Sequence, residues 1–180
     1  MPATHVALLR GINVGGKNLL PMKDLAAAFV AAGCEQVRTY IQSGNVIFSA
    51  PPGSEDQLHD RIGAQLAQRF GYTAPLALRT TEQLRAAIRA NPYLALGAKE
   101  ETLHVMFLTA TPDASAVEKL DPGRSPGDEY QVIGREIYLR LPTGMARTKL
   151  TNAYFDAKLG VTSTARNWRT TTKLLELMEG

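Results

Sequence analysis

Two periodicities of apolar residues divide this chain into short predicted elements. Apolar runs of about five residues predict strands, whereas apolar residues spaced three and four apart predict helices. The first half of the chain reads as strand, helix, strand, strand, helix, strand, helix. We predict strands at residues 5–9, 37–41, 45–49 and 74–78, and helices at 21–32, 54–70 and 80–91.

Turn and capping residues support these boundaries. Pro21 in the first turn and Gly33 just past the end delimit the first predicted helix. The next two helices begin with the spacing of a capping box, which is Ser54 with Gln57 and Thr80 with Gln83.

The second half of the chain repeats the same order of elements. We predict strands at 104–108, 129–133, 137–141 and, weakly, 161–164, and helices at 115–120, 148–159 and 168–178. Three local matches support an internal duplication. HVALL at 5–9 matches HVMFL at 104–108 with an offset of 99, and GNVIF at 44–48 matches GREIY at 134–138 with an offset of 90. RTTEQL at 79–84 matches RTTTKL at 169–174, again with an offset of 90.

The repeated β-α-β-β-α-β order is that of a ferredoxin-like unit, an antiparallel sheet with two helices on one face. We therefore predict an α+β protein of two ferredoxin-like subdomains, residues 1–97 and 98–180, each with an extra helix. The first strand of each half does not alternate apolar with polar residues, which indicates that both faces of each sheet are covered.

The two offsets place nine additional residues between the first strand and the hairpin of the first half. RGINVGGKNLL, which follows Leu9, is the obvious place for this surplus. Strand-to-helix connectors usually have about 2–6 residues, so a longer Gly-rich connector favours a functional role over a plain turn.

This loop contains G-x-x-x-x-G-K from Gly11 to Lys17, which differs from a phosphate-binding P-loop. A P-loop needs Ser or Thr after the Lys to bind magnesium, and Asn18 stands there instead. Leu20 precedes Pro21, so the helix begins too late. We therefore exclude the P-loop of nucleoside triphosphatases.

A different anion site remains compatible with the loop. Backbone N–H groups around two consecutive glycines can form a concave nest, and the flanking basic residues add charge. The two asparagines could bind a ligand or only stabilise turns. The candidate ligand-binding residues here are Arg10, Gly11, Asn13, Gly15, Gly16, Lys17 and Asn18.

A second candidate is TARNWRTTTKLL at residues 164–175, where the only Trp lies between two Arg residues. Trp168 either anchors the last helix in the core or offers an aromatic platform beside two guanidinium groups. PTGMARTK at 142–149 adds basic residues before another predicted helix. The candidates are Lys149, Arg166, Asn167 and Trp168.

TYIQSGN at residues 39–45 is the third candidate, with Tyr40, Ser43 and Asn45 as possible ligand-binding residues. The simplest interpretation is a tight hairpin turn. Catalytic patterns are otherwise sparse, because the three His residues are scattered and none has metal-ligand spacing with Cys or a carboxylate. We expect no metal site and no cofactor, and we identify no catalytic residue.

Composition narrows the environment of the protein. The chain has 180 residues, 44% of them hydrophobic, and one Cys, so no disulfide is possible within it and a reducing cytoplasm is expected. No apolar run approaches the about 20 residues that span a bilayer, and we expect no membrane contact. The net charge of +3 is uneven: residues 140–173 carry +6 and residues 100–136 carry −5.

Five motifs along the chain together resemble the bacterial family called domain of unknown function 1697. They are LLRGINVGGKN, TYIQSGNVIF, NPY at 91–93, IYLRLPTG at 137–144 and TARNWRT. The resemblance implies two ferredoxin-like subdomains, in agreement with the repeat, and it implies no reaction. Its motifs fall on the loops already identified, which favours a site there.

Two functional hypotheses follow. The first is a pocket for a small phosphorylated or otherwise anionic ligand, built by the Gly-rich loop and the Arg-rich C-terminal cluster. The second is a nucleic-acid-binding protein that uses the +6 stretch, although QSGNVIFSA carries only Phe48 of the strand aromatics on which bases usually stack. A protein-interaction module is neither supported nor excluded.

Overall fold

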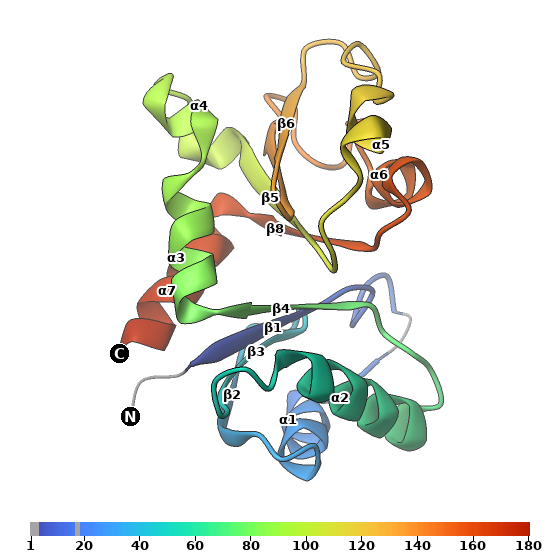
Figure 1. Cartoon of the computed structure of the whole chain (residues 1–180), viewed down its shortest axis with the longest axis vertical. Coiled ribbons are helices and arrows are strands. Elements are labelled where there is room, and N and C mark those ends of the chain that lie inside the picture. Colours follow the sequence, from blue (N-terminus) through green and yellow to red (C-terminus); the bar gives the residue numbers. More distant parts are fainter. Residues whose placement is uncertain (1–3, 17–18) are drawn as a thin grey trace. The chain divides into compact units, whose positions relative to one another are not determined.

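The computed structural model describes residues 4–16 and 19–180 and has an α+β fold with two four-stranded antiparallel sheets (Figure 1). The chain forms two compact units. Unit 1 contains residues 1–85 and 174–180, and unit 2 contains residues 86–173. The two boundaries between the units fall inside helix α3 (Thr81–Arg89) and helix α7 (Trp168–Glu179).

Unit 1 contains a sheet with the strand order β2-β3-β1-β4 and two long helices. In chain order, its elements before α3 are β1 (His5–Leu9), α1 (Met22–Ala31), β2 (Glu35–Tyr40), β3 (Asn45–Ser49), α2 (Glu55–Phe70) and β4 (Leu76–Thr80).

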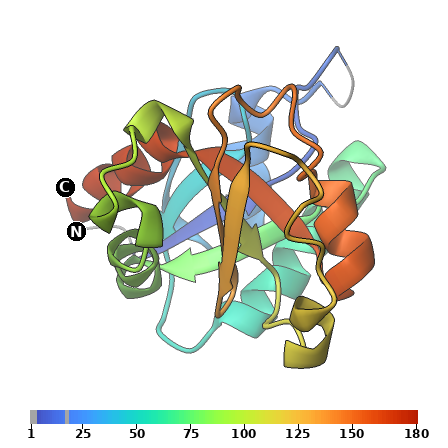
Figure 2. The ribbon, with the colours of Figure 1, turned by 90° about the horizontal axis from the view of Figure 1, so that it is seen from above.

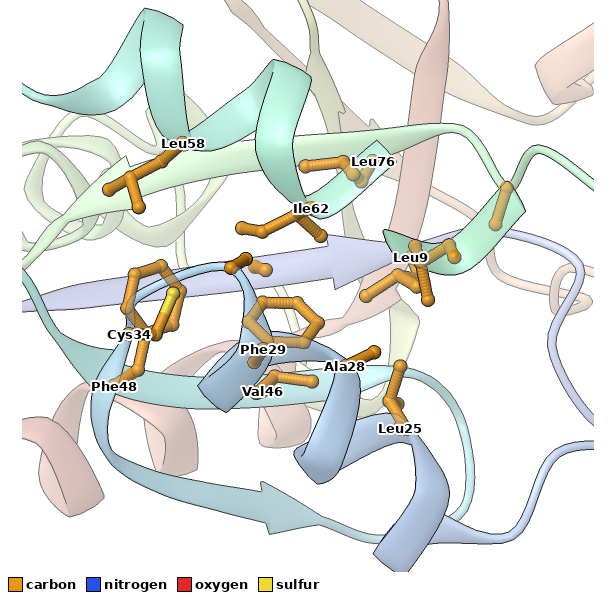
Figure 3. Close-up of a cluster of buried hydrophobic side chains, with 14 of the residues drawn as sticks. Leu9, Leu25, Ala28, Phe29, Cys34, Val46, Phe48, Leu58, Ile62 and Leu76 are labelled. Carbon is orange, nitrogen blue, oxygen red and sulfur yellow. The ribbon is translucent and has the colours of Figure 1, made fainter. Parts of the chain in front are cut away.

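The core of unit 1 forms where α1 and α2 pack against one face of this sheet (Figure 3). Phe29 from α1 and Ile62 from α2 are fully buried there with Phe48 from β3. Cys34 belongs to the same cluster, and burial raises the pKa of its thiol to about 11, so it behaves as a small apolar residue.

Unit 2 has a sheet with the strand order β6-β7-β5-β8. Its elements between α3 and α7 are α4 (Pro92–Ala95), a 3-10 turn (Glu100–Thr102), β5 (Leu103–Leu108), α5 (Ala114–Glu118), β6 (Glu129–Ile133), β7 (Glu136–Arg140), α6 (Asn152–Leu159) and β8 (Ser163–Asn167). Residues of α6, including Phe155, pack on Met106 and Leu139 of the sheet to form its core, and Figure 2 shows these elements from above.

The first strands of the two sheets have corresponding partners. β1 lies between β3 and β4, and β5 lies between β7 and β8, all antiparallel. All five residues of β1 are buried, as expected for a strand covered on both faces. The fold thus gives both halves the same strand order.

The pairing register corrects two of the three sequence matches. Ala7 pairs with Val46 and Met106 pairs with Ile137, so β3 corresponds to β7 with an offset of 91, not 90. The connection is therefore eight residues longer in unit 1 rather than nine.

The third match is wrong by three residues. Arg79 pairs with Val6, and Arg166 pairs with Val105, so the counterpart of Arg79 is Arg166 and not Arg169. The identical RTT sequences are not structurally equivalent. The first lies at the end of β4, whereas the second lies inside α7.

The capping predictions had different outcomes. At α3 the box is confirmed, since the Gln83 amide N–H donates to Thr80 Oγ1 at 3.2 Å and the Thr80 amide N–H donates to Gln83 Oε1 at 3.0 Å. At α2 the prediction is wrong, because the Ser54 hydroxyl donates to the Pro51 carbonyl and makes no cap bond. A hydroxyl that finds a nearer carbonyl acceptor leaves the helix N–H groups to other partners.

Hydrogen bonds join each unit to its part of a helix that the unit boundary divides. Unit 1 includes the end of α7, and unit 2 includes the end of α3. In unit 1, Arg38 Nη2 donates to the Leu177 carbonyl of α7 at 2.9 Å. In unit 2, the Tyr138 hydroxyl donates to the Ala87 carbonyl of α3 at 2.6 Å. The predicted division after residue 97 stays a prediction.

Candidate functional site

The Gly-rich loop leaves β1 and follows an unusual backbone path. Gly11, Gly15 and Gly16 have φ values of 76°, 60° and 72°, and Asn13 has 55°. Glycine adopts this left-handed region readily and Asn does so more often than other residues, so the sequence suits the path. The three glycines are exposed, so the backbone of the loop faces solvent. Lys17 and Asn18 lie outside the described residues.

Asn13 closes the loop with its side chain. Its Oδ1 accepts the Leu20 amide N–H at 2.7 Å, and its Nδ2 donates to the Leu20 carbonyl at 3.0 Å. The same Nδ2 lies 3.3 Å from the carbonyl oxygen of Gln42, in the β2–β3 turn. Asn13 therefore stabilises the turn and joins two of the predicted motifs, the loop and TYIQSGN.

Replacing Asn13 should open this loop. We expect Asn13→Gly, which tolerates the left-handed backbone, to destabilise unit 1 by about 1–2 kcal/mol through its lost hydrogen bonds. Asn13→Ala should cost up to about 1 kcal/mol more because Ala also strains φ. Hydrogen exchange of the Leu20 amide gives the direct measurement. A Leu20 amide as protected in Asn13→Gly as in the parent protein would contradict the role of this side chain.

The β2–β3 turn is built from the residues of the third motif. Asn45 is fully buried, and its Nδ2 donates to the Tyr40 carbonyl at 3.0 Å and to Ser43 Oγ at 2.8 Å. The Gly44 carbonyl accepts the Leu9 amide N–H at 2.9 Å. A Cβ on Gly44 would lie 2.9 Å from Leu9 Cβ and 3.1 Å from the Leu9 carbonyl oxygen, so only glycine fits. The turn is thus locked against the start of the Gly-rich loop.

Apolar side chains are exposed on these two segments. Val14 is 64% exposed and Leu19 is 73% exposed, while Ile41 in the turn is 51% exposed. Ile41 also has a φ of 49°, which costs energy in a β-branched residue. Strain and exposed apolar surface concentrate here, as they often do where a protein binds something.

The C-terminal candidates lie in unit 2. Arg166 is on β8 and only 9% exposed, and its Nη1 donates to the Ala165 carbonyl at 2.8 Å. Burial lowers the pKa of the Arg166 guanidinium to about 10, which shows that its charge is poorly solvated. Lys149 is exposed, and its backbone N–H donates to Ser125 Oγ at 3.0 Å.

The next two residues begin the last helix. Asn167 Oδ1 accepts the Thr170 amide N–H at 2.7 Å, so this side chain serves the first turn of α7. Trp168 is 2% exposed, which gives the indole the environment of a core anchor. A stacking role for Trp168 or a ligand contact for Asn167 stays a prediction. The loop and turn motifs therefore meet in unit 1, whereas the Arg166 group belongs to unit 2.

Arg79 is a buried basic residue that the sequence analysis missed. It is 1% exposed, and its Nη1 donates to the Leu78 carbonyl at 2.8 Å, the same geometry that Arg166 has with Ala165. The sequence signal is an Arg in the apolar run PLALRT, but aligning RTT with RTT hid its equivalence to Arg166.

A cavity of about 660 Å³ in unit 2 was also missed. Tyr93, Lys99 and Arg140 line it, and Arg140 Nη1 donates to Glu129 Oε2 at 2.9 Å. Burial, and then the charge of Glu129, raise the pKa of Tyr93 to about 12. The NPY motif was the available signal: Asn91 Oδ1 accepts the Tyr93 amide N–H and thereby starts α4.

Comparisons with known proteins identify the family of this chain. Residues 3–138 match the family described as Protein of unknown function (DUF1697). The chain belongs to this family. The match includes the Gly-rich loop, the β2–β3 turn and NPY, and it ends before the Arg166 group. No curated protein matches the chain significantly.

One solved structure has the same fold as this DUF1697 protein. It is the conserved bacterial protein SP0830 from Streptococcus pneumoniae, with a TM-score of 0.76, 23% sequence identity and 99% of each chain covered. Within residues 4–16 and 19–180, we find no helix with the length and apolar character that crossing a membrane requires. The same residues contain no group of three His, Cys, Asp or Glu side chains arranged to hold a metal ion.

Proposed function

We propose that this DUF1697 protein binds a small phosphorylated or otherwise anionic ligand through the Gly-rich loop, with the Arg166 group of unit 2 as a second contributor. The observation that carries the proposal is the run of left-handed backbone at Gly11, Asn13, Gly15 and Gly16 in an exposed loop. Such a backbone turns successive N–H groups toward one side and forms a concavity for an anion.

The anchoring of the loop supports this function. Asn13 fixes one end to Leu20, and the Arg10 amide N–H donates to the Pro75 carbonyl at 2.9 Å. A backbone site that is held before binding loses less conformational entropy when the ligand arrives. Arg10 and, by its place in the sequence alone, Lys17 would supply the charge.

Arg166 supports the second contribution by a different route. Its guanidinium is buried in unit 2, and the planar group suits bidentate binding of phosphate or carboxylate oxygens. Lys149 is exposed in the same unit and adds a second positive charge.

A phosphate titration followed by amide NMR tests the loop. With inorganic phosphate and then pyrophosphate as probes, we expect the largest shifts at the Gly15 and Gly16 amides. Gly16→Ala keeps every charge, but the free loop of the variant should leave the left-handed backbone, which costs Ala about 1–2 kcal/mol. Binding must then restore that backbone, so affinity should fall roughly 5- to 30-fold. Gly127→Ala, at a φ of 91° with open space around its Cβ position, is the matched control and should bind normally. Unchanged loop amides at saturating pyrophosphate would overturn the proposal.

Charge-removing variants test the basic residues. Lys17→Ala and Arg166→Ala should each weaken pyrophosphate binding by about 1.5–3 kcal/mol, roughly 10- to 150-fold. The exposed residues Lys23 in unit 1 and Arg89 in unit 2 supply the controls Lys23→Ala and Arg89→Ala. If the two groups act on one ligand, the double variant should show non-additive losses; additive losses would separate them.

The same variants discriminate nucleic-acid binding through the +6 stretch. A nucleic-acid surface loses little affinity with each basic residue removed, and its affinity for a thymidine oligonucleotide falls steeply with salt. Small additive losses with a steep salt slope would replace the small-ligand proposal by this alternative.

We also infer that the two units are copies of one ferredoxin-like unit, with subdomains near residues 1–97 and 98–180. The shared strand order and the paired partners of β1 and β5 support this inference. On that view the Gly-rich loop is an addition to one copy, which is how a new site can arise without disturbing the sheet.

A further inference from the structure

A cavity of about 590 Å³ in unit 1 contains three side chains that the anion site does not use. Thr4 stands just before β1, His5 is the first residue of β1, and Glu55 is the first residue of α2. Ala50, Pro52 and Met178 contribute apolar surface to the same cavity.

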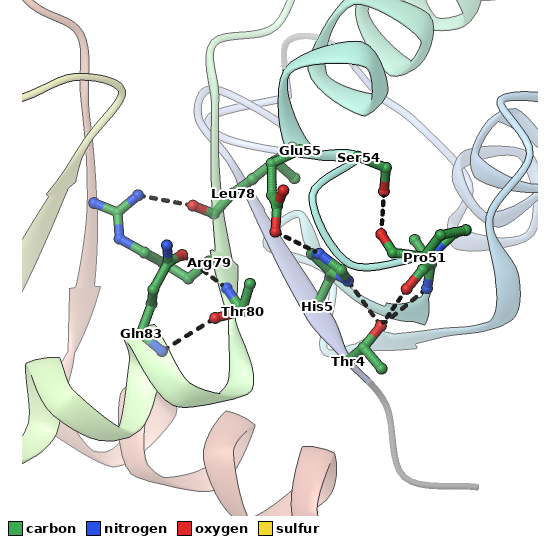
Figure 4. A network of polar contacts seen from close by, with 10 residues as sticks. Thr4, His5, Pro51, Ser54, Glu55, Leu78, Arg79, Thr80 and Gln83 are labelled. Carbon is green, nitrogen blue, oxygen red and sulfur yellow. Dashed lines mark hydrogen bonds and ion pairs between the residues drawn. The ribbon is translucent and has the colours of Figure 1, made fainter.

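These three side chains form a continuous hydrogen-bonded chain (Figure 4). Thr4 Oγ1 lies 2.7 Å from His5 Nδ1, and His5 Nε2 lies 3.3 Å from Glu55 Oε1. An ionised carboxylate only accepts, so the ring proton belongs on Nε2 and Nδ1 is left to accept the Thr4 hydroxyl proton. The arrangement is a hydroxyl, a base and a group that orients the base.

The structure holds each member in place. His5 is 1% exposed, and its ring stacks on Phe48 with centroids 5.4 Å apart and planes 10° apart. Its own backbone N–H lowers the pKa of the Glu55 carboxyl, and the contact with His5 lowers it further, so the carboxylate stays ionised.

Thr4 is exposed and fixed at the same time. Its amide N–H donates to the Phe48 carbonyl at 3.1 Å, and its Oγ1 accepts the Ala50 amide N–H at 2.9 Å. The Ala50 carbonyl is a second possible acceptor for the hydroxyl proton at 3.2 Å, longer than the contact to His5. With one lone pair accepting from Ala50, the other remains available for attack.

Unit 2 shows that this constellation is not a requirement of the fold. His104 pairs with Leu139 on β7 just as His5 pairs with Phe48 on β3. Leu103 precedes it instead of a Thr, and His104 Nδ1 is buried with no hydrogen-bond partner among the described residues. A hydroxyl beside the ring nitrogen is therefore a feature of unit 1 and not a requirement of the strand arrangement.

We propose that Thr4, His5 and Glu55 form an acyl-transfer site that hydrolyses small uncharged esters, with Thr4 as nucleophile, His5 as general base and Glu55 as positioning residue. Thr4 Oγ1 bonds to the ester carbonyl carbon while its proton passes to His5 Nδ1. The bond to the leaving alcohol then breaks, and that oxygen takes the proton from His5. Water attacks the acyl-Thr4 ester, gives one proton to His5, and the returned proton restores the Thr4 hydroxyl as the carboxylic acid leaves.

The surrounding charges favour an uncharged ester over a phosphate ester. Glu55, Glu82 and Glu179 line the cavity, whereas Arg85 is the only Lys or Arg among the described residues that line it. Arg85 is already paired with Glu82 and, at 2.7 Å, with Glu179. An anionic substrate would meet net repulsion here, in contrast to the Gly-rich loop.

Labelling with p-nitrophenyl acetate tests the assignment. We expect release of p-nitrophenol together with acetylation of Thr4, located by peptide mass. Thr4→Ser should keep the label and Thr4→Val should lose it. His5→Gln should slow acetylation of residue 4 by about 100-fold or more, because a general base contributes that much. His59, which is exposed on α2, provides the control His59→Gln.

Glu55→Gln separates a positioned base from a purely structural His. A neutral amide cannot stabilise the positive charge that develops on the His5 ring as the ring takes the Thr4 proton, so acetylation of Thr4 should slow while the urea unfolding midpoint stays near that of His59→Gln. Glu55 is partly exposed, so this variant decides the question even if His5→Gln fails to fold. No label on Thr4, or equal rates of acetylation in Glu55→Gln and His59→Gln, would overturn the proposal.

Discussion

Replacing Phe29 with alanine should lower the free energy of unfolding by about 3–5 kcal/mol, the usual cost of removing a buried aromatic side chain. Phe29 is fully buried on α1, where its ring lies 5.5 Å from that of Phe48. The side chain fills the space between α1, α2 and the sheet of unit 1. The residues of this cluster come from β1, α1, β3, α2 and β4, so they cannot collapse easily into the cavity.

The adjacent residue supplies the control for this prediction. Val30 is 60% exposed on the same helix, and Val30→Ala should change stability by less than about 0.5 kcal/mol. Urea unfolding of both variants, followed by circular dichroism, measures the difference. If the two variants unfold at the same urea concentration, the assignment of Phe29 to the core of unit 1 is wrong.

Replacing Gly44 with valine should cost about 2–6 kcal/mol, the sum of left-handed strain and overpacking. Gly44 has a φ of 80°, and its backbone packs directly on Leu9. The close atoms include the Leu9 carbonyl oxygen, and backbone atoms cannot move aside as a flexible side-chain end can. The substitution should also break the Leu9–Gly44 hydrogen bond and so release the start of the Gly-rich loop.

Gly71 separates the two contributions. It has a φ of 73° at the end of α2 with open space around its Cβ position, so Gly71→Val pays only the strain, about 1–3 kcal/mol. The difference between the two variants measures the steric contact at Gly44. Equal losses in urea unfolding would show that the turn yields and does not lock the loop.

Local sequence patterns predicted the elements whose signals lie within a few neighbouring residues. The α3 capping box is one example, because both partners lie within one turn of helix and need no tertiary contact. Strands β4 and β8 each start two residues later than predicted, and they end two and three residues later, respectively. Their last residues include Arg79 and Arg166, which are polar letters at buried strand positions.

The candidate site also has features that the sequence predicts and features that depend on tertiary contacts. Glycines at positions 11, 15, 16 and 44 predicted turns from the sequence alone, because few other residues tolerate a left-handed backbone. That the loop and the β2–β3 turn meet through Asn13 and Gln42 could not be read from sequence, since no spacing rule links residues 29 positions apart.

By itself the sequence determined the order of the strands and of the helices other than α4, the position of the Gly-rich connection after β1 and the family, all of which depend on local patterns. Only the tertiary structure decided the pairing register, the burial of Arg79 and Arg166, and the contact of His5 with Glu55 across 50 residues. The reason is that side-chain desolvation and hydrogen-bond partners depend on which segments pack together. The pairing of His5 with Glu55 in unit 1 could therefore be identified only from the tertiary structure.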